Sequence, residues 1–123
     1  MTNKLAALII DKLKTGSIKN VILFSDDDVF PEPPYVIVKP EIGTLQNTRS
    51  YKIIAHMEKG NFDILEDYVL KEIDSLLLSD YLKDEEGSRF KLYASGFTDI
   101  TPEKSDNSCF MERLYYTPMR IKN

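Results

Sequence analysis

Two adjoining segments with different hydrophobic periods place the strongest constraint on how this chain can fold. Between Ser50 and Glu58 the apolar side chains alternate with more polar ones, at Tyr51, Ile53, Ala55 and Met57. This two-residue period is typical of a strand with one buried face. After Asn61, a candidate N-cap, apolar residues recur at helical spacing, at Phe62, Leu65, Val69, Ile73, Leu76 and Leu77. The pattern predicts a helix of about five turns that packs its apolar face on the sheet.

The rest of the chain predicts a second helix and four more strands. The helix begins at the candidate N-cap Thr2-Asn3 and ends before Gly16, and its apolar residues recur at helical spacing at Leu5, Leu8, Ile9 and Leu13. The strands are expected at Val21–Phe24, Tyr35–Val38, Phe90–Ser95 and Cys109–Ile121. Gly96 is expected to form a bend or bulge, and the last two strands to form a hairpin with a long loop.

This order of elements, α-β-β-β-α-β-β, predicts an α+β fold. We expect a mixed or antiparallel sheet of about five strands and two main helices. A chain of 123 residues suits one compact domain, so residues 1–123 are expected to form a single domain.

Composition argues against several classes of protein. Sixteen Lys and Arg stand against twenty Asp and Glu, for a net charge of −4, and the basic residues are scattered, so tight binding to a nucleic-acid backbone is disfavoured. The run Leu5–Ile10 is too short to cross a membrane and has no small-residue cleavage site, so no membrane contact and a cytoplasmic protein are expected. Cys109 is the single cysteine and is expected to be buried, without a disulfide.

An acidic loop precedes the second strand and raises the question of a metal site. Asp26, Asp27 and Asp28 are followed by Glu32 and several prolines. Three consecutive aspartates in an extended loop point to alternating sides, so they do not converge on one ion. A Mg²⁺-dependent nuclease would need an acidic residue two positions before Lys39, where the chain has Ile37. We expect a solvated loop, with no metal and no cofactor.

The sequence predicts no catalytic site. His56 is the only histidine, lies on the less buried face of its strand and has no nucleophile or orienting acid in a recognisable pattern. Phosphate-binding, hydrolase and zinc motifs are missing from the sequence. Seven tyrosines without a tryptophan suit protein–protein contact, although residues at the edge of the core would give the same composition.

Three segments together resemble one family of virion proteins. They are the strand Pro34–Val38 after its acidic loop, the strand Tyr51–His56 leading through Gly60 into the helix, and the pair Gly96–Ile100 and Met111–Tyr116. In this order they resemble the tail-terminator and tail-completion proteins of long-tailed bacteriophages and prophages, which join tail to head. The resemblance covers nearly the whole chain and rests on a pattern of elements.

The resemblance implies a structural virion protein that is not an enzyme. In that family the chain forms a ring, expected here to be a homo-hexamer, at the head-proximal end of the tail. The ring ends growth of the tail tube and contacts the tube protein and the head connector or neck proteins. DNA passes through it without being recognised by sequence. The protein would be found in the host cytoplasm during assembly and then in the virion.

Charged loops are the predicted partner interface. The acidic candidates are Asp26, Asp27, Asp28, Glu32, Asp84, Glu85 and Glu86, and the basic candidates are Arg49, Lys52 and Arg113. Alternatives are a neighbouring neck or head–tail connector protein, a cytoplasmic adaptor that binds a peptide on a strand edge, and an enzyme-like domain with a cleft near His56.

Overall fold

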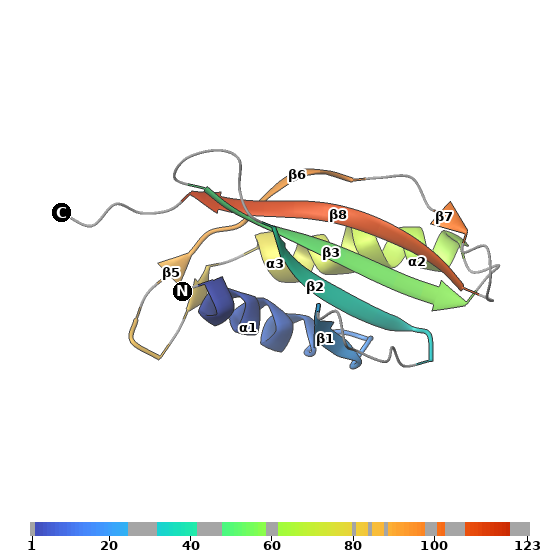
Figure 1. Ribbon diagram of the computed structural model, residues 1–123, viewed down its shortest axis with the longest axis horizontal. Helices are drawn as coiled ribbons and strands as arrows, with labels where there is room; N and C mark the ends of the chain where they lie inside the picture. Colours follow the sequence, from blue (N-terminus) through green and yellow to red (C-terminus); the bar gives the residue numbers. More distant parts are fainter. Residues whose placement is uncertain are drawn as a thin grey trace.

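The computed structural model describes residues 2–24, 32–41, 48–58, 62–79, 81–83, 85–87, 89–97, 101–102 and 108–118. Over these ranges the chain forms one mixed sheet with helices on it and a separate small hairpin (Figure 1). The α+β fold predicted from the sequence is confirmed, and the main elements follow each other in the predicted order.

Six described strands make up the main sheet, five of them in the order β1-β2-β3-β8-β6 and the short β7 also paired with β8. Their bounds are β1 Val21–Leu23, β2 Tyr35–Glu41, β3 Thr48–Glu58, β6 Tyr93–Phe97, β7 Thr101–Pro102 and β8 Ser108–Pro118. β1 pairs with β2 in parallel, and every other pair is antiparallel. The longest ladder joins β3 to β8, from Thr48 opposite Pro118 to Glu58 opposite Ser108. This central pair sets the register for the rest of the sheet.

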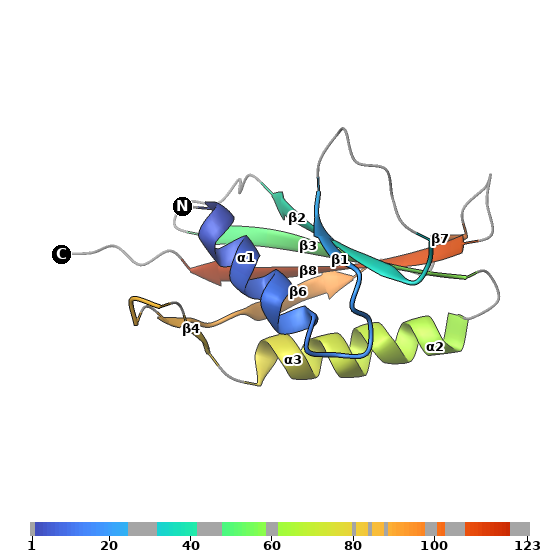
Figure 2. The same ribbon diagram turned by 90° about the horizontal axis from the view of Figure 1, so that it is seen from below.

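The helices cover one face of the sheet and enclose the core. The first helix is α1, Thr2–Leu13. The second is continuous from Phe62 to Leu78 and comprises α2 Phe62–Asp67, the π-helical segment η1 Tyr68–Ile73, and α3 Asp74–Leu78. It runs along the sheet (Figure 2), and α1 contacts β1, β2 and α3. Tyr51 and Tyr115 of the sheet are among the largest fully buried side chains of this core.

The π-helical segment follows from the spacing of the buried residues. The side chains of Leu65, Val69, Ile73 and Leu77 are all fully buried, and they recur at strict intervals of four. In an ideal α-helix each four-residue step rotates about 40° beyond a full turn, so this stripe would wind away from the sheet. A π turn takes more residues than an α turn, which brings the stripe back onto one face. Leu76, expected in this face, is only half-buried.

Two local details differ from the sequence prediction. The charged segment 80–88, expected to be a loop, contributes β4 Leu82–Lys83, which pairs with β5 Arg89–Phe90. The predicted strand Phe90–Ser95 is therefore divided between this hairpin and β6. Burial of Leu82 in the core draws the segment inward and explains the extra pairing. The predicted irregularity at Gly96 is confirmed, because the β6–β8 register shifts between Ala94 and Gly96.

The second strand extends beyond Val38, where it was expected to end, because the ladder with β3 continues through Pro40, which lies opposite Tyr51. Lys91, between β5 and β6, donates a hydrogen bond from Nζ to the carbonyl oxygen of Leu78 at 2.7 Å. An ammonium group there satisfies a terminal carbonyl and complements the negative end of the helix dipole. Lys91 thereby fixes the exit of the helix towards the hairpin.

Candidate functional site

Two polar clusters connect the second helix to other parts of the chain. The first joins the helix to β8. Arg113 donates from Nε to Oδ1 of Asp74 at 2.8 Å and from Nη2 to Oδ2 at 2.9 Å, the two-point geometry that arginine makes with a carboxylate. Tyr115 donates its hydroxyl proton to Oδ1 of the same Asp74. The exposed fractions of the Arg113 and Asp74 side chains are 12% and 22%, so water screens this cluster only in part.

The environment shifts the ionisation of this first cluster. Burial raises the pKa of Tyr115, and its hydrogen bond to the Asp74 carboxylate raises it further. Burial alone would lower the pKa of Arg113, but the hydrogen bonds and the charge of Asp74 outweigh burial and raise it. Both side chains therefore stay protonated, and the cluster acts as a fixed link between helix and sheet.

The second cluster joins the helix to the loop after α1. The Glu72 carboxylate accepts hydrogen bonds from the backbone N–H of Ser17 at 2.7 Å and from the Ser17 hydroxyl at 2.8 Å and 2.9 Å. Lys19 closes the same loop by donating from Nζ to the carbonyl oxygens of Gly16 at 2.7 Å and Lys14 at 3.2 Å. A Cβ at Gly16 would lie 2.9 Å from Cδ1 of Leu76 and closer still to Oε2 of Glu72. Glycine is therefore the residue that lets the carboxylate approach this backbone.

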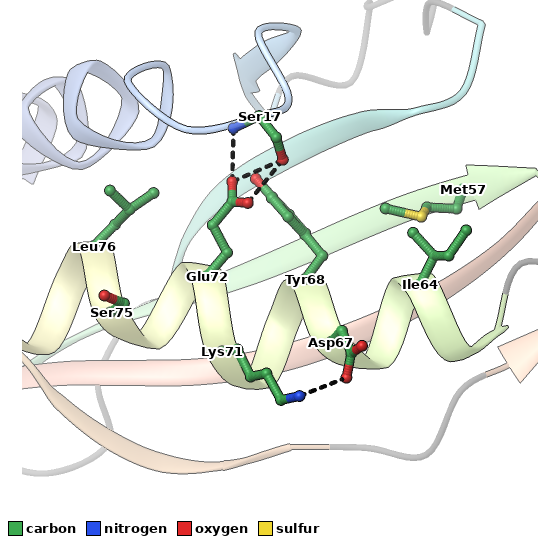
Figure 3. Close-up of a pocket in the computed structure, with 9 residues that line it drawn as sticks. All are labelled: Ser17, Met57, Ile64, Asp67, Tyr68, Lys71, Glu72, Ser75 and Leu76. Carbon is green, nitrogen blue, oxygen red and sulfur yellow. Dashed lines mark hydrogen bonds and ion pairs between the residues drawn. The ribbon is translucent and has the colours of Figure 1, made fainter.

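An open pocket of about 530 Å³ borders the second cluster (Figure 3). Its polar lining includes Ser17, Glu72 and Tyr68, whose side chains converge in the close-up. Tyr68 is 5% exposed, and its buried hydroxyl has no hydrogen-bond partner among the described residues. Burial raises the pKa of Tyr68, and the nearby charge of Glu72 raises it further. Met57, Ile64 and Leu76 supply apolar lining.

The remaining lining residues of the pocket are Asp67, Lys71 and Ser75. Asp67 and Lys71 form an ion pair one helical turn apart, with 3.4 Å between Nζ and Oδ1. This pair is exposed and neutralises itself. The carboxylate of Glu72 therefore decides the charge of the pocket.

The structure separates the predicted interface residues into three groups. Asp26, Asp27, Asp28 and Asp84 lie outside the described residues. Glu32, Glu85 and Glu86 are exposed, the latter two in the turn between β4 and β5. Arg49, Lys52 and Arg113 are half-buried strand residues.

The basic members of that set already have partners within the chain. Lys52 lies between two carboxylates, with Nζ 3.3 Å from Glu41 and 3.8 Å from Glu112. Arg49 forms a side-chain hydrogen bond with Tyr51 that opposes the rise in pKa that burial causes in that tyrosine. Arg113 is bound to Asp74. The structure thus does not bring the acidic and basic candidates together into one site.

His56 lies on the sheet face that points away from the core cluster, as predicted, but it is not a surface residue. It is 9% exposed, and its ring stacks between those of Tyr35, at 4.5 Å, and Phe110, at 5.3 Å. The three residues occupy matched positions on β2, β3 and β8. Cross-strand stacking of this kind buries the imidazole without any covering helix.

Apart from Arg113, which was a basic interface candidate, the residues of both clusters were missed from the sequence. Asp74 and Glu72 flank the buried Ile73. Their charged side chains beside the apolar stripe of the helix were the one sequence feature that could have marked them as polar contacts of the core. Their partners could not be identified, because Ser17 lies 55 positions from Glu72 and Arg113 lies 39 positions from Asp74.

No familiar site among the described residues and no relative indicates a particular chemistry. Within the described ranges no three His, Cys, Asp or Glu side chains are grouped to hold a metal ion. Among the helices of the described residues, none has the length and apolar character needed to cross a membrane. No family model matches the chain, and no curated protein does.

The fold itself recurs in solved structures, of which 22 chains match. One is 12% identical in sequence, covers 96% of this chain and 93% of its own, and superposes with a TM-score of 0.53. The name of that protein states no function. At this identity the likeness concerns the fold alone.

Proposed function

We propose that this chain is a structural protein of a phage or prophage tail. It forms a ring, of six copies as the resemblance implies, at the head-proximal end of the tail. The ring stops growth of the tail tube and joins the tail to the head. Its partners are the tube protein on one side and the head connector or neck proteins on the other.

The observation that carries the proposal is the placement of the three segments that resemble the family. They lie far apart in the sequence, yet β2, β3 and β8 are neighbours in the sheet and β6 pairs with β8. The helix that follows β3 packs on the same sheet. The resemblance implies a single domain in which helices pack on a mixed sheet, and this placement of the segments supports it.

The two lateral edges of the sheet also suit contact between copies. Leu23 and Phe24 are exposed at the β1 edge, and Tyr93 is exposed at the β6 edge. Exposed apolar side chains on open sheet edges favour contact with another chain. A ring uses two different surfaces of each subunit, and the two edges supply such surfaces.

The test is a tail-assembly experiment observed by negative-stain electron microscopy. Tubes assembled with the purified chain should have a narrow length distribution and a ring at one end. Tubes assembled without it should be overlong and should fail to join heads. Normal tube lengths in its absence would contradict the proposal, and head binding without length control would instead favour a neighbouring neck protein.

The acidic loop offers a variant for the same assay. Replacing Asp26, Asp27 and Asp28 together with Ser should change stability by less than about 0.5 kcal/mol, as expected for the solvated loop that the sequence predicts. We expect this variant to fold and yet fail to cap tubes, because the loop was predicted as a partner contact. A His56→Ala variant serves as the comparison. Normal capping by the loop variant together with failure of His56→Ala would contradict this assignment.

A further inference from the structure

The pocket beside η1 holds a carboxylate that has no counter-ion among the described residues. Both donors to Glu72, the backbone N–H and the hydroxyl of Ser17, are neutral. The lysine of the lining, Lys71, pairs with Asp67, and Lys19 of the adjoining loop donates to backbone carbonyl oxygens. No ion pair of the described residues involves Glu72. Its negative charge is therefore left for a ligand to neutralise.

The Tyr68 hydroxyl points to a ligand at the same place. It is buried and has no hydrogen-bond partner among the described residues, which is uncommon because such a group loses its hydration without compensation. Tyr68 lines the pocket, and its phenol turns towards the Glu72 carboxylate (Figure 3). An ammonium group has three donors, so one that binds Glu72 also has a donor for the phenolic oxygen.

The hydrogen bonds that Glu72 already accepts restrict the cation that it can take. The hydroxyl of Ser17 is 2.8 Å from Oε1 and 2.9 Å from Oε2. A donor at nearly equal distances from both oxygens occupies the edge of the carboxylate that the two parallel N–H groups of a guanidinium would use. Oε2 also accepts the backbone N–H of Ser17, so Oε1 retains more free acceptor capacity. A point-like ammonium fits that position better than a guanidinium.

The apolar lining and the open mouth narrow the ligand further. Met57 and Leu76 line the pocket together with Ile64, which is 58% exposed. A lysine side chain carries its ammonium on an apolar stem, so both parts have a matching surface. Sites for free small molecules enclose most of the ligand, whereas this pocket is open. A side chain presented by a protein needs no such enclosure, because the surface that carries it covers the mouth.

We infer that this pocket is a binding site for a lysine side chain presented by another protein. The ammonium donates to Oε1 of Glu72 and to the phenolic oxygen of Tyr68, and the stem packs on Met57, Ile64 and Leu76. The inference goes beyond the proposed function and does not depend on it, because the residues of the pocket alone carry it.

An NMR titration of the intact, ¹⁵N-labelled chain with the peptide acetyl-Leu-Lys-Leu-amide tests the site. Peptide concentrations extend into the millimolar range, as suits a contact made by one side chain. Saturable shifts are expected at the amides of residues 17, 68 and 72. The same peptide with an acetylated lysine ammonium keeps the stem and loses the charge, and it should bind about tenfold more weakly. The arginine peptide should bind several-fold more weakly than the lysine peptide.

Variants of the chain test the two polar partners. Glu72→Gln should weaken binding of the lysine peptide about tenfold, and Tyr68→Phe should weaken it several-fold. Glu66→Gln is the matched control, because it removes an exposed carboxylate of the same helix outside the pocket, and it should have no effect. Glu72 also holds Ser17, so circular dichroism checks that each variant is folded. The comparison of peptides on the wild type tests the need for a charge without any variant.

Four results would overturn the inference. They are the absence of shifts at the pocket, equal affinity for the charged and the acetylated lysine peptides, equal or tighter binding of the arginine peptide, and unchanged binding by folded Glu72→Gln and Tyr68→Phe. A titration with n-butylammonium distinguishes the source of the cation. It should bind about tenfold more weakly than the lysine peptide, because it lacks the residues that would cover the mouth. Equal affinity would identify a site for free amines and overturn the protein occupant. The tail-assembly experiment tests the proposed function separately.

Discussion

Replacing Asp74 with alanine should be among the most damaging single changes to this fold. The substitution removes the acceptor of two Arg113 hydrogen bonds and of the Tyr115 hydroxyl. It leaves a guanidinium in a side chain that is only 12% exposed and a hydroxyl on a fully buried tyrosine.

The typical energetic costs of such changes set the size of the expected effect. Removing one partner of a buried ion pair costs about 3–5 kcal/mol, and an unsatisfied buried hydroxyl costs about 1–3 kcal/mol. The two contributions overlap, because Arg113 is partly solvated and water entering the cavity would reach both groups. We therefore expect Asp74→Ala to lower the free energy of unfolding by about 3–5 kcal/mol.

Urea unfolding followed by far-ultraviolet circular dichroism measures this loss, with an unchanged m value indicating that the folded state is otherwise intact. Asp67→Ala is the matched control, because that carboxylate on the same helix is 65% exposed and pairs with a 78% exposed Lys71. It should cost less than about 0.5 kcal/mol. Adding Arg113→Met to Asp74→Ala should recover part of the loss, because no charge is then left unpaired. Equal effects of Asp74→Ala and Asp67→Ala, with no coupling to Arg113, would refute the structural role assigned to the cluster.

Three further outcomes are expected. Burial raises the folded-state pKa of Tyr115, Tyr68 and Tyr51 above the ordinary value of 10, so their contribution to stability is complete below pH 10 and is lost as pH rises through the folded-state values. Tyr115→Phe should therefore flatten a plot of unfolding free energy against pH above 10, by up to about 1.4 kcal/mol per pH unit. An unchanged slope would count against this. Ile73→Ala should lower the free energy of unfolding in urea by about 2–5 kcal/mol, because the side chain is fully buried. Ile64→Ala, at a 58% exposed position, should lower it by less than about 0.5 kcal/mol. A loss of stability at Ile73 as small as that at Ile64 would mean that the helix face is wrongly assigned. Gly16→Ala should lower the free energy of unfolding by about 1–2 kcal/mol, because the new methyl group displaces the Glu72 carboxylate. This loss should largely disappear in a protein that already carries Glu72→Ala. A full loss in the Glu72→Ala protein would mean that the strain arises at another contact.

The sequence was enough to predict the fold class because its strongest patterns are local. Alternation in β3 and the apolar stripe of the following helix both lie within one continuous segment, and period alone identifies them. The β4–β5 hairpin was missed because each strand has only two residues, too short for any period. The candidate pocket was missed because its polar residues lie on separate elements, and only the packed fold brings Ser17 beside Glu72. The partners of Arg113 were missed for the same reason, since its contact with Asp74 depends on the register of β8 against β3.

The π-helical segment has a consequence for how the length of the chain can change. Between Tyr68 and Asp74 the widened turn keeps Ile73 and Leu77 in line with Leu65, and it delivers Asp74 to Arg113. Deleting one residue there would let the helix return to α geometry and would keep the later side chains in line, because the widened turn already holds more residues than an α turn. A deletion of one residue elsewhere in the helix would instead rotate every later side chain by about 100°, so this segment is the place where the helix can best lose a residue.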